Sequence, residues 1–278
     1  MERDQATRAP AEVLTDQTSA TIEEVAEGLY ESLRHGRLAP MPLRPQDEAL
    51  LAQCESFHFA DSRRLAGWSV GEGRAVLLVH GWGGRGAQMA KIALALADHG
   101  FRAVFFDAGA HGNSDPMPMG FDRFMEDAAE LQACVGQAPY AWIGHSAGAL
   151  AMMSARRTHG IAAERFVCIA TPFFPYVPIE RMQRSRAPQA ALDLVKVRIA
   201  AQFEASWTQL EGGLAWRPDP AQALMFAYDA ADEVARPSDA DAILSACPAA
   251  ALVQTEGLGH NRILQSDKVI SAILAHLA

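Results

Sequence analysis

The sequence predicts an α/β fold with a mostly parallel, doubly wound sheet. Continuous apolar runs at residues 75–80, 101–107 and 165–170 are typical of strands covered on both faces. Segments with helical spacing alternate with them, and this alternation favours parallel strands joined by right-handed crossovers. The chain has 278 residues, half of them apolar, so it can bury a core of this kind.

Composition and charge exclude several classes of function. A net charge of −9 argues against nucleic acid or an anionic membrane as the main partner. The first ten residues are charged, with no apolar stretch behind them, and no apolar run is long enough to span a membrane.

The four cysteines lack metal-ligand spacing. We therefore expect buried reduced thiols in a cytoplasmic protein, with no metal and no cofactor.

The first 55 residues predict an N-terminal helical extension and a linker. Ile22, Val25, Leu29 and Leu33 recur at helical spacing, and acidic residues near the start suit the helix dipole. Three prolines within residues 38–45 predict an extended connector, and residues 46–54 a short helix. We expect the first helix to pack on the domain, while a homodimer contact or a docking role stays open.

The core is predicted over residues 56–170 and 223–278. Residues 56–60 and 65–70 flank a polar turn and predict a leading hairpin. The strand at 75–80, a helix at 87–99, the strand at 101–107 and a helix at 121–134 follow. An elbow strand then begins at Tyr140, before a helix at 149–157 and the strand at 165–170. After the insertion, the pattern predicts strands at 223–229 and 249–255 and helices at 239–247 and 265–277.

Between residues 171 and 222 the alternation breaks. Prolines open an aromatic-rich loop, and residues 179–184 and 188–210 have helical patterns. An insertion of this length is too long for a connector and too short for a domain. We expect a small helical lid.

One pentapeptide, Gly144-His145-Ser146-Ala147-Gly148, has the form G-x-S-x-G. It lies between a strand-like segment and a helix-forming run, as a nucleophile elbow requires. The two glycines are needed because neighbouring chain segments pass close to so sharp a turn. We predict that Ser146 is a nucleophile.

Four motifs in order make the chain resemble the α/β-hydrolase family from residue 75 to the C-terminus. They are His80-Gly-Trp-Gly-Gly84, Asp107-Ala-Gly-Ala-His-Gly-Asn-Ser114, the 144–148 pentapeptide and Gly257-Leu-Gly-His260. The resemblance implies the α/β-hydrolase fold and a serine nucleophile assisted by a histidine and an acid, in this chain order.

The resemblance implies particular partners for Ser146. A serine hydroxyl needs a base, and that base needs an orienting acid. His260 stands at the family's place for the base. His80, His111 and His145 are better explained as structural residues beside the motifs. The family's acid position falls on Asp232, with Asp229 as the alternative, because Asp229 occupies the position where the family has glycine.

Two backbone N–H groups are expected to form the oxyanion hole, which holds the negative charge of an acyl-transfer transition state. The resemblance assigns them to Ala147 and Trp82. A phosphate-binding role for the glycine loop at 81–86 is disfavoured, because the loop lacks both G-x-G-x-x-G spacing and a lysine-serine pair.

Aromatic and methionine side chains could line an apolar substrate pocket, although such residues also suit a simple core. The candidates are Trp82, Met152, Met153, Phe173, Phe174, Tyr176, Phe203, Trp207 and Trp216.

These features predict a serine hydrolase that cleaves a small-molecule ester, thioester or lactone with an apolar part. Cleavage of an amide, a carbon–carbon bond or a peroxy acid by the same residues remains open. A ligand receptor or scaffold that keeps the fold without catalysis is the alternative from another class.

Overall fold

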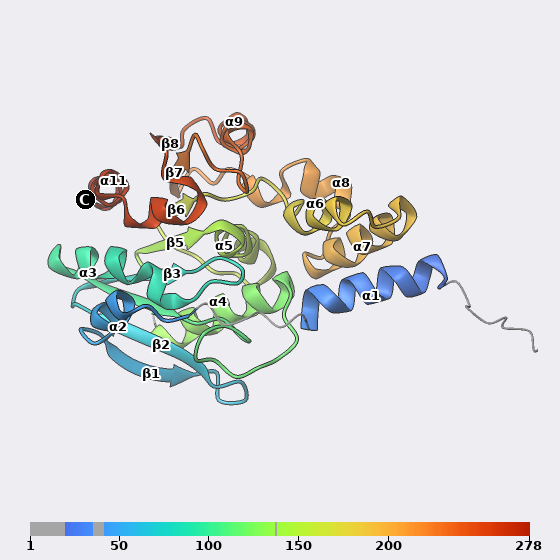
Figure 1. Cartoon of the computed structure of the whole chain (residues 1–278). Helices are drawn as coiled ribbons and strands as arrows, with labels where there is room; N and C mark the ends of the chain where they lie inside the picture. The colour runs from blue at the N-terminus through green and yellow to red at the C-terminus, as the bar shows by residue number, and fades with distance from the viewer. Residues whose placement is uncertain (1–19, 36–41, 137) are drawn as a thin grey trace, which may run out of the picture.

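The computed structural model describes residues 20–35, 42–136 and 138–278. This part of the chain contains an eight-stranded sheet with strand order β1-β2-β4-β3-β5-β6-β7-β8 (Figure 1). The hairpin β1–β2 is antiparallel, β2 pairs antiparallel with β4, and β3 to β8 are parallel. The strands are β1 (Glu55–Phe59), β2 (Leu65–Val70), β3 (Arg74–Val79), β4 (Phe101–Phe106), β5 (Ala141–His145), β6 (Arg165–Ile169), β7 (Ala223–Asp229) and β8 (Ala251–Thr255).

The parallel strands are buried on both faces, as their unbroken apolar sequences predict. Val76 to Val79 on β3 have no exposed surface, and Phe105 and Phe106 on β4 are equally buried. The mostly parallel, doubly wound sheet predicted from the sequence is therefore confirmed, and so is the antiparallel hairpin before it.

Two pairs of helices cover the two faces of the sheet (Figure 1). One pair is α3 (Ala90–Asp98) with α11 (Asp267–Leu277), and the other is α4 (Phe121–Val135) with α5 (Ser146–Thr158). α4 ends at Val135 and is capped by Gly136, whose φ of +78° is a left-handed conformation that favours glycine. The other helical elements of the core are η1 (Gly86–Met89), α9 (Pro237–Ala246), α10 (Gly259–Arg262) and η3 (Ile263–Gln265).

The strand order places a crevice at the carboxyl end of the sheet. β3 has β4 on one side and β5 on the other, so the chain winds in opposite directions from this point. Open α/β sheets bind ligands at the carboxyl ends of the strands where the winding direction changes. The loops after β3 and β5 both begin there.

Residues 171–222, called the insertion below, contain α6 (Val177–Arg184), α7 (Gln189–Gln202), α8 (Trp207–Glu211) and η2 (Leu214–Trp216). The prediction of one helix over residues 188–210 was wrong. α7 ends at Gln202, and Glu204 has a φ of +50°, which interrupts the helix. Ser206 starts α8 with a capping box, in which it accepts a hydrogen bond from Gln209 N and donates its own N–H to the Gln209 side chain.

The first helix, α1 (Ile22–His35), packs against α7 of the insertion (Figure 1). We expected contact with the domain, and the structure shows that the insertion provides most of it. The expected proline-rich connector falls partly on residues 36–41, outside the described residues. The next helix, α2 (Pro45–Leu51), ends three residues earlier than predicted and contacts α3.

The four cysteines are unbonded, and Cys168 and Cys247 are buried as expected. Cys134 is exposed and Cys54 is only partly buried, which corrects the expectation that all four are buried. Of the helices that the structure describes, none combines the length and the apolar character that crossing a bilayer requires.

Candidate active site

The turn between β5 and α5 holds Ser146 in a strained conformation. Its φ of +52° lies in the left-handed region that non-glycine residues avoid. A Cβ on Gly144 would lie 2.5 Å from Ala149 Cα, and one on Gly148 would lie 2.0 Å from the His80 carbonyl oxygen. Both glycines are therefore required by close backbone approach. This geometry is that of a nucleophile elbow.

His260 joins Ser146 to a carboxylate. Its Nε2 atom lies 2.8 Å from Ser146 Oγ, and its Nδ1 atom lies 2.8 Å from Asp232 Oδ2. The carboxylate can only accept, so Nδ1 carries the proton and Nε2 is the acceptor for the serine hydroxyl. Ser146, His260 and Asp232 come from the ends of β5, β8 and β7. The structure thus brings together three residues that lie up to 114 positions apart.

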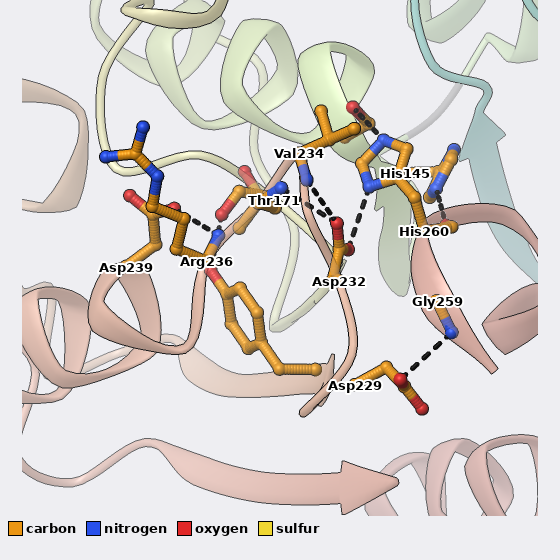
Figure 2. Close-up of polar contacts among 12 residues, drawn as sticks. His145, Thr171, Asp229, Asp232, Val234, Arg236, Asp239, Gly259 and His260 are labelled. Carbon is orange, nitrogen blue, oxygen red and sulfur yellow. Dashed lines mark hydrogen bonds and ion pairs between the residues drawn. The ribbon is translucent and has the colours of Figure 1, made fainter. Parts of the chain in front are cut away.

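The orientation of Asp232 is set by backbone donors. Its Oδ1 atom accepts hydrogen bonds from Val234 N at 2.8 Å and Ala235 N at 3.0 Å, which leaves Oδ2 for His260 (Figure 2). The side chain has no exposed surface. A buried carboxylate with every oxygen engaged has little freedom to rotate, so it fixes the plane and the tautomer of the imidazole.

Asp229, the alternative acid, contacts the loop that carries His260 but not its ring (Figure 2). It accepts hydrogen bonds from Gly259 N, Ala231 N, Leu258 N and the Thr255 hydroxyl, at 2.7 to 3.0 Å. Burial favours the neutral acid, but these hydrogen bonds outweigh it and lower the pKa of Asp229 to about 2. Its geometry is that of a brace between the end of β7 and the loop after β8.

The two expected oxyanion donors, Trp82 and Ala147, both line the cavity beside Ser146. The Ala147 N–H lies in the first turn of α5, where helical N–H groups have no partner within the helix. The loop with Trp82 is folded by a hydrogen bond from Gly84 N to Gly81 O at 3.0 Å. Gly83, between them, has a φ of +72°.

Two buried histidines hold this loop in place. His80 Nδ1 donates to Gly81 O at 2.8 Å and Nε2 accepts from Ala108 N at 3.0 Å. His111 Nδ1 donates to Gly109 O at 2.8 Å and Nε2 accepts from Gly83 N at 3.0 Å. Burial lowers the pKa of His80 to about 4 and that of His111 to about 3, so both are neutral at pH 7. The structural role expected for these residues agrees with the contacts.

His145 holds the backbone of His260, the expected base. Its Nε2 donates to the backbone oxygen of His260 at 2.9 Å, and the two rings lie 4.9 Å apart between centroids. Burial, with the charge of His260 as a smaller cause, lowers the pKa of His145 to about 3. A neutral His145 can hold the backbone of His260 without repelling the imidazolium that forms on proton transfer.

A cavity of about 600 Å³ opens above Ser146. Its floor contains Ser146, Trp82 and His260, and its roof contains residues of the insertion and of α1. Of the described residues that line it, Arg181 alone carries a permanent charge. Most other roof residues are apolar, including Leu29, Leu33, Pro175, Val177, Pro178 and Met182.

The predicted pocket residues, apart from Trp82, lie elsewhere and must be corrected. None of the others lines this cavity. They pack into the interior of the insertion or of the core, because the insertion has to bury its own apolar side chains. The corrected residues are Met152, Met153, Phe173, Phe174, Tyr176, Phe203, Trp207 and Trp216.

Two of these residues have clear structural roles. Tyr176 OH lies 2.6 Å from Asp239 Oδ2 and 3.0 Å from Val234 O, so it ties the insertion to the Asp232 loop. Phe174 packs edge to face on Trp207, with ring centroids 5.7 Å apart.

Sequence reasoning missed the residues of α1 and α6 that line the cavity. Their apolar face was visible at helical spacing, but no local signal tells which element such a face will contact.

The chain belongs to the alpha/beta hydrolase family, whose model matches residues 76–272. It is 34% identical over 109 residues to the pimeloyl-[acyl-carrier protein] methyl ester esterase of Methylococcus capsulatus, covering 39% of this chain and 41% of that protein. It is 24% identical over 145 residues to the non-heme chloroperoxidase CPO-A1 of Kitasatospora aureofaciens, covering 51% of this chain and 53% of that one.

The chain thus spans about half the length, or less, of these two relatives. Among solved structures it resembles E-2-(acetamidomethylene)succinate hydrolase, with a TM-score of 0.61 and 17% identity, covering 81% of this chain and 99% of that one. At that identity the likeness concerns the fold alone.

Proposed function

We propose that this protein is a serine hydrolase that cleaves carboxylic ester-type bonds through a Ser146–His260–Asp232 triad and an acyl-enzyme intermediate. The observation that carries the proposal is the pair of 2.8 Å contacts on either side of the His260 ring. Such a chain of acid, base and nucleophile lowers the cost of deprotonating a serine hydroxyl at neutral pH.

The reaction follows from the positions of the donors and acceptors. His260 Nε2 takes the proton as Ser146 Oγ attacks the carbonyl carbon, and Asp232 stabilises the resulting imidazolium. The backbone N–H groups of Trp82 and Ala147 receive the developing oxyanion, and a donor of this kind contributes about 10²-fold to 10³-fold in rate. His260 then protonates the leaving alcohol or thiol, and water releases the acid by the reverse sequence.

The insertion and α1 give this site an apolar roof. We assign residues 171–222 the role of a lid, because they supply Pro175, Val177, Pro178 and Met182 to the cavity. An apolar enclosure strengthens the electrostatic interactions inside it and selects substrates with an apolar part. The fragmentary match to a methyl ester esterase agrees with this substrate class.

Hydrolysis of p-nitrophenyl acetate and octanoate tests the proposal. Ser146→Ala, His260→Ala and Asp232→Asn should each lower kcat by about 10⁴-fold or more. Ser154→Ala is a matched control, because Ser154 is a buried serine of the same helix that bonds Leu150 O at 2.8 Å and does not line the cavity. It should retain wild-type turnover.

Labelling by a fluorophosphonate separates catalysis from mere binding. A hydrolase should be labelled at Ser146 and not in the Ser146→Ala variant. A folded wild-type protein that neither labels nor turns over any ester would instead be a ligand receptor.

The match to a chloroperoxidase favours one further assay. An acyl-enzyme can pass its acyl group to hydrogen peroxide in place of water, which yields a peroxy acid. Peroxyacetic acid formed from an acetate ester and peroxide, and lost with Ser146→Ala, would establish this second activity.

A further inference from the structure

The helix α1 lies outside the region matched by the family model, yet it is firmly attached to the site. Tyr30 OH accepts a hydrogen bond from Gln202 Nε2 at 2.9 Å, and Gln202 Oε1 accepts one from Phe121 N at 2.6 Å. Arg34 pairs with Asp122 at 3.1 Å. α1 is thereby joined both to α7 and to the start of α4.

Two further contacts fix its orientation. Glu27 forms an ion pair with Arg198 of α7, and Met119 N donates to Arg34 O at 2.8 Å. Ala26 has no exposed surface. These contacts fix how α1 is rotated about its axis, and this rotation determines which of its other side chains face the cavity.

Leu29 and Leu33 lie one helical turn apart, so they share a face of α1. Both line the cavity that contains Ser146, and both are only partly buried although they pack on the core. An apolar side chain in such a position gains further burial when an apolar group enters the cavity.

The apolar lining that α1 contributes suits the acyl part of an ester. His260 must protonate the leaving group, so the alcohol lies next to the His260 ring. α1 lies beside Phe121, whose N–H donates to Gln202, and the ring centroids of Phe121 and Trp82 are 6.1 Å apart. The acyl chain cannot share the place of the leaving group, and Leu29 and Leu33 provide an apolar surface of the same cavity that can receive it.

We propose that α1 forms the acyl-chain wall of the pocket, with Leu29 and Leu33 as the residues that determine chain-length selectivity. The favoured substrates are then esters or thioesters of medium-chain apolar acids. This inference rests on the proposed ester hydrolysis, and it adds the substrate's acyl class and an element that the family model does not include.

The test compares p-nitrophenyl acetate, octanoate and dodecanoate. Leu33→Trp puts a larger side chain on the α1 side of the cavity, and each methylene of the acyl chain that loses its contact should cost about fourfold in binding. We expect kcat/KM for octanoate to fall about tenfold or more, through KM, while the value for acetate stays within about twofold. The double variant Leu29→Ala/Leu33→Ala should shift the preference toward dodecanoate.

Ile22→Ala is the matched control, because Ile22 lies on the same helix, is 38% exposed and does not line the cavity. It should keep the wild-type preference. Fluorophosphonate labelling of each variant at the wild-type rate shows that the triad is intact. An octanoate-to-acetate ratio unchanged in both leucine variants would overturn the proposal.

A binding measurement separates this inference from the proposed function. Calorimetric titration with sodium octanoate should show about tenfold weaker binding by Leu33→Trp than by wild type and Ile22→Ala. If Leu33→Trp binds octanoate more weakly but no protein hydrolyses an ester, the proposed hydrolase activity is refuted and the acyl-chain wall is supported. Equal octanoate affinities in the three proteins would refute the proposal that α1 forms the acyl-chain wall.

Discussion

The two candidate acids can be separated by making the same substitution at each. Asp229 and Asp232 are both buried and both fully hydrogen-bonded, so Asp→Asn is nearly isosteric at either position. Their partners differ, however. Asp229 bonds only groups of the fold, whereas Asp232 bonds His260. We expect Asp229→Asn to lose stability and Asp232→Asn to lose activity.

The cost of Asp229→Asn follows from its four donors. The NH₂ group of the new amide is best placed toward Thr255, because the Thr255 hydroxyl can rotate and accept a hydrogen bond. The Leu258 N–H is then left without an acceptor, which costs about 1–3 kcal/mol of stability. The bonds from Gly259 N and Ala231 N lose their charge assistance at about 1 kcal/mol each. The total of about 4 kcal/mol corresponds to a Tm lower by roughly 10 °C.

Asp232→Asn is expected to keep most of its stability, because the amide oxygen can still accept from Val234 N and Ala235 N. The NH₂ group then faces His260 Nδ1, which must accept rather than donate. This moves the imidazole proton to Nε2, where it can no longer accept from Ser146. Loss of the correct tautomer lowers kcat by about 10⁴-fold.

Thermal unfolding followed by circular dichroism and ester hydrolysis at 25 °C measure the two effects. We expect Asp229→Asn to retain kcat/KM within about tenfold of wild type when assayed well below its Tm. The reasoning is refuted if Asp229→Asn abolishes turnover at an unchanged Tm, or if Asp232→Asn hydrolyses esters at the wild-type rate.

Three further predictions concern the loop, the elbow and the roof. His111 has a pKa lowered by burial to about 3, so its contribution to stability is fully present above about pH 6.5 and is lost as the pH falls toward 3. Urea unfolding at pH 7 and pH 5 should show that the gap in unfolding free energy between wild type and His111→Asn shrinks by about 2 kcal/mol at pH 5; an equal gap at both values would contradict it. Gly148→Ala would place its Cβ 2.0 Å from the His80 carbonyl oxygen, and we expect urea unfolding to show a loss of about 3 kcal/mol or more, with Gly28→Ala, whose Cβ would meet nothing within 4 Å, as the control. Unchanged stability of Gly148→Ala would show that the elbow can relax. Arg181→Gln removes the permanent charge from the cavity lining, so kcat/KM should fall several-fold for the hemisuccinate ester of p-nitrophenol and stay level for the neutral butyrate; equal effects on both would exclude a role in anion recognition.

The sequence by itself determined the order of strands and helices and the identity of the elbow. These features are local, because the burial of a parallel strand is visible in its own residues and a sharp turn needs its own glycines. Even the break within the second insertion helix had a local signal, Ser206 followed by Gln209, which forms a capping box.

Only the tertiary structure decided which carboxylate meets His260 and which apolar residues face Ser146. Asp229 is the last residue of β7 and Asp232 follows three residues later, and their roles depend on where the loop after β8 lies. The aromatic residues of the insertion have the same composition whether they line a cavity or fill a core. Leu29 and Leu33 reach the cavity because α7 and Asp122, far along the chain, hold α1 beside it. These contacts depend on packing between segments far apart in the chain, so a short sequence pattern cannot predict them.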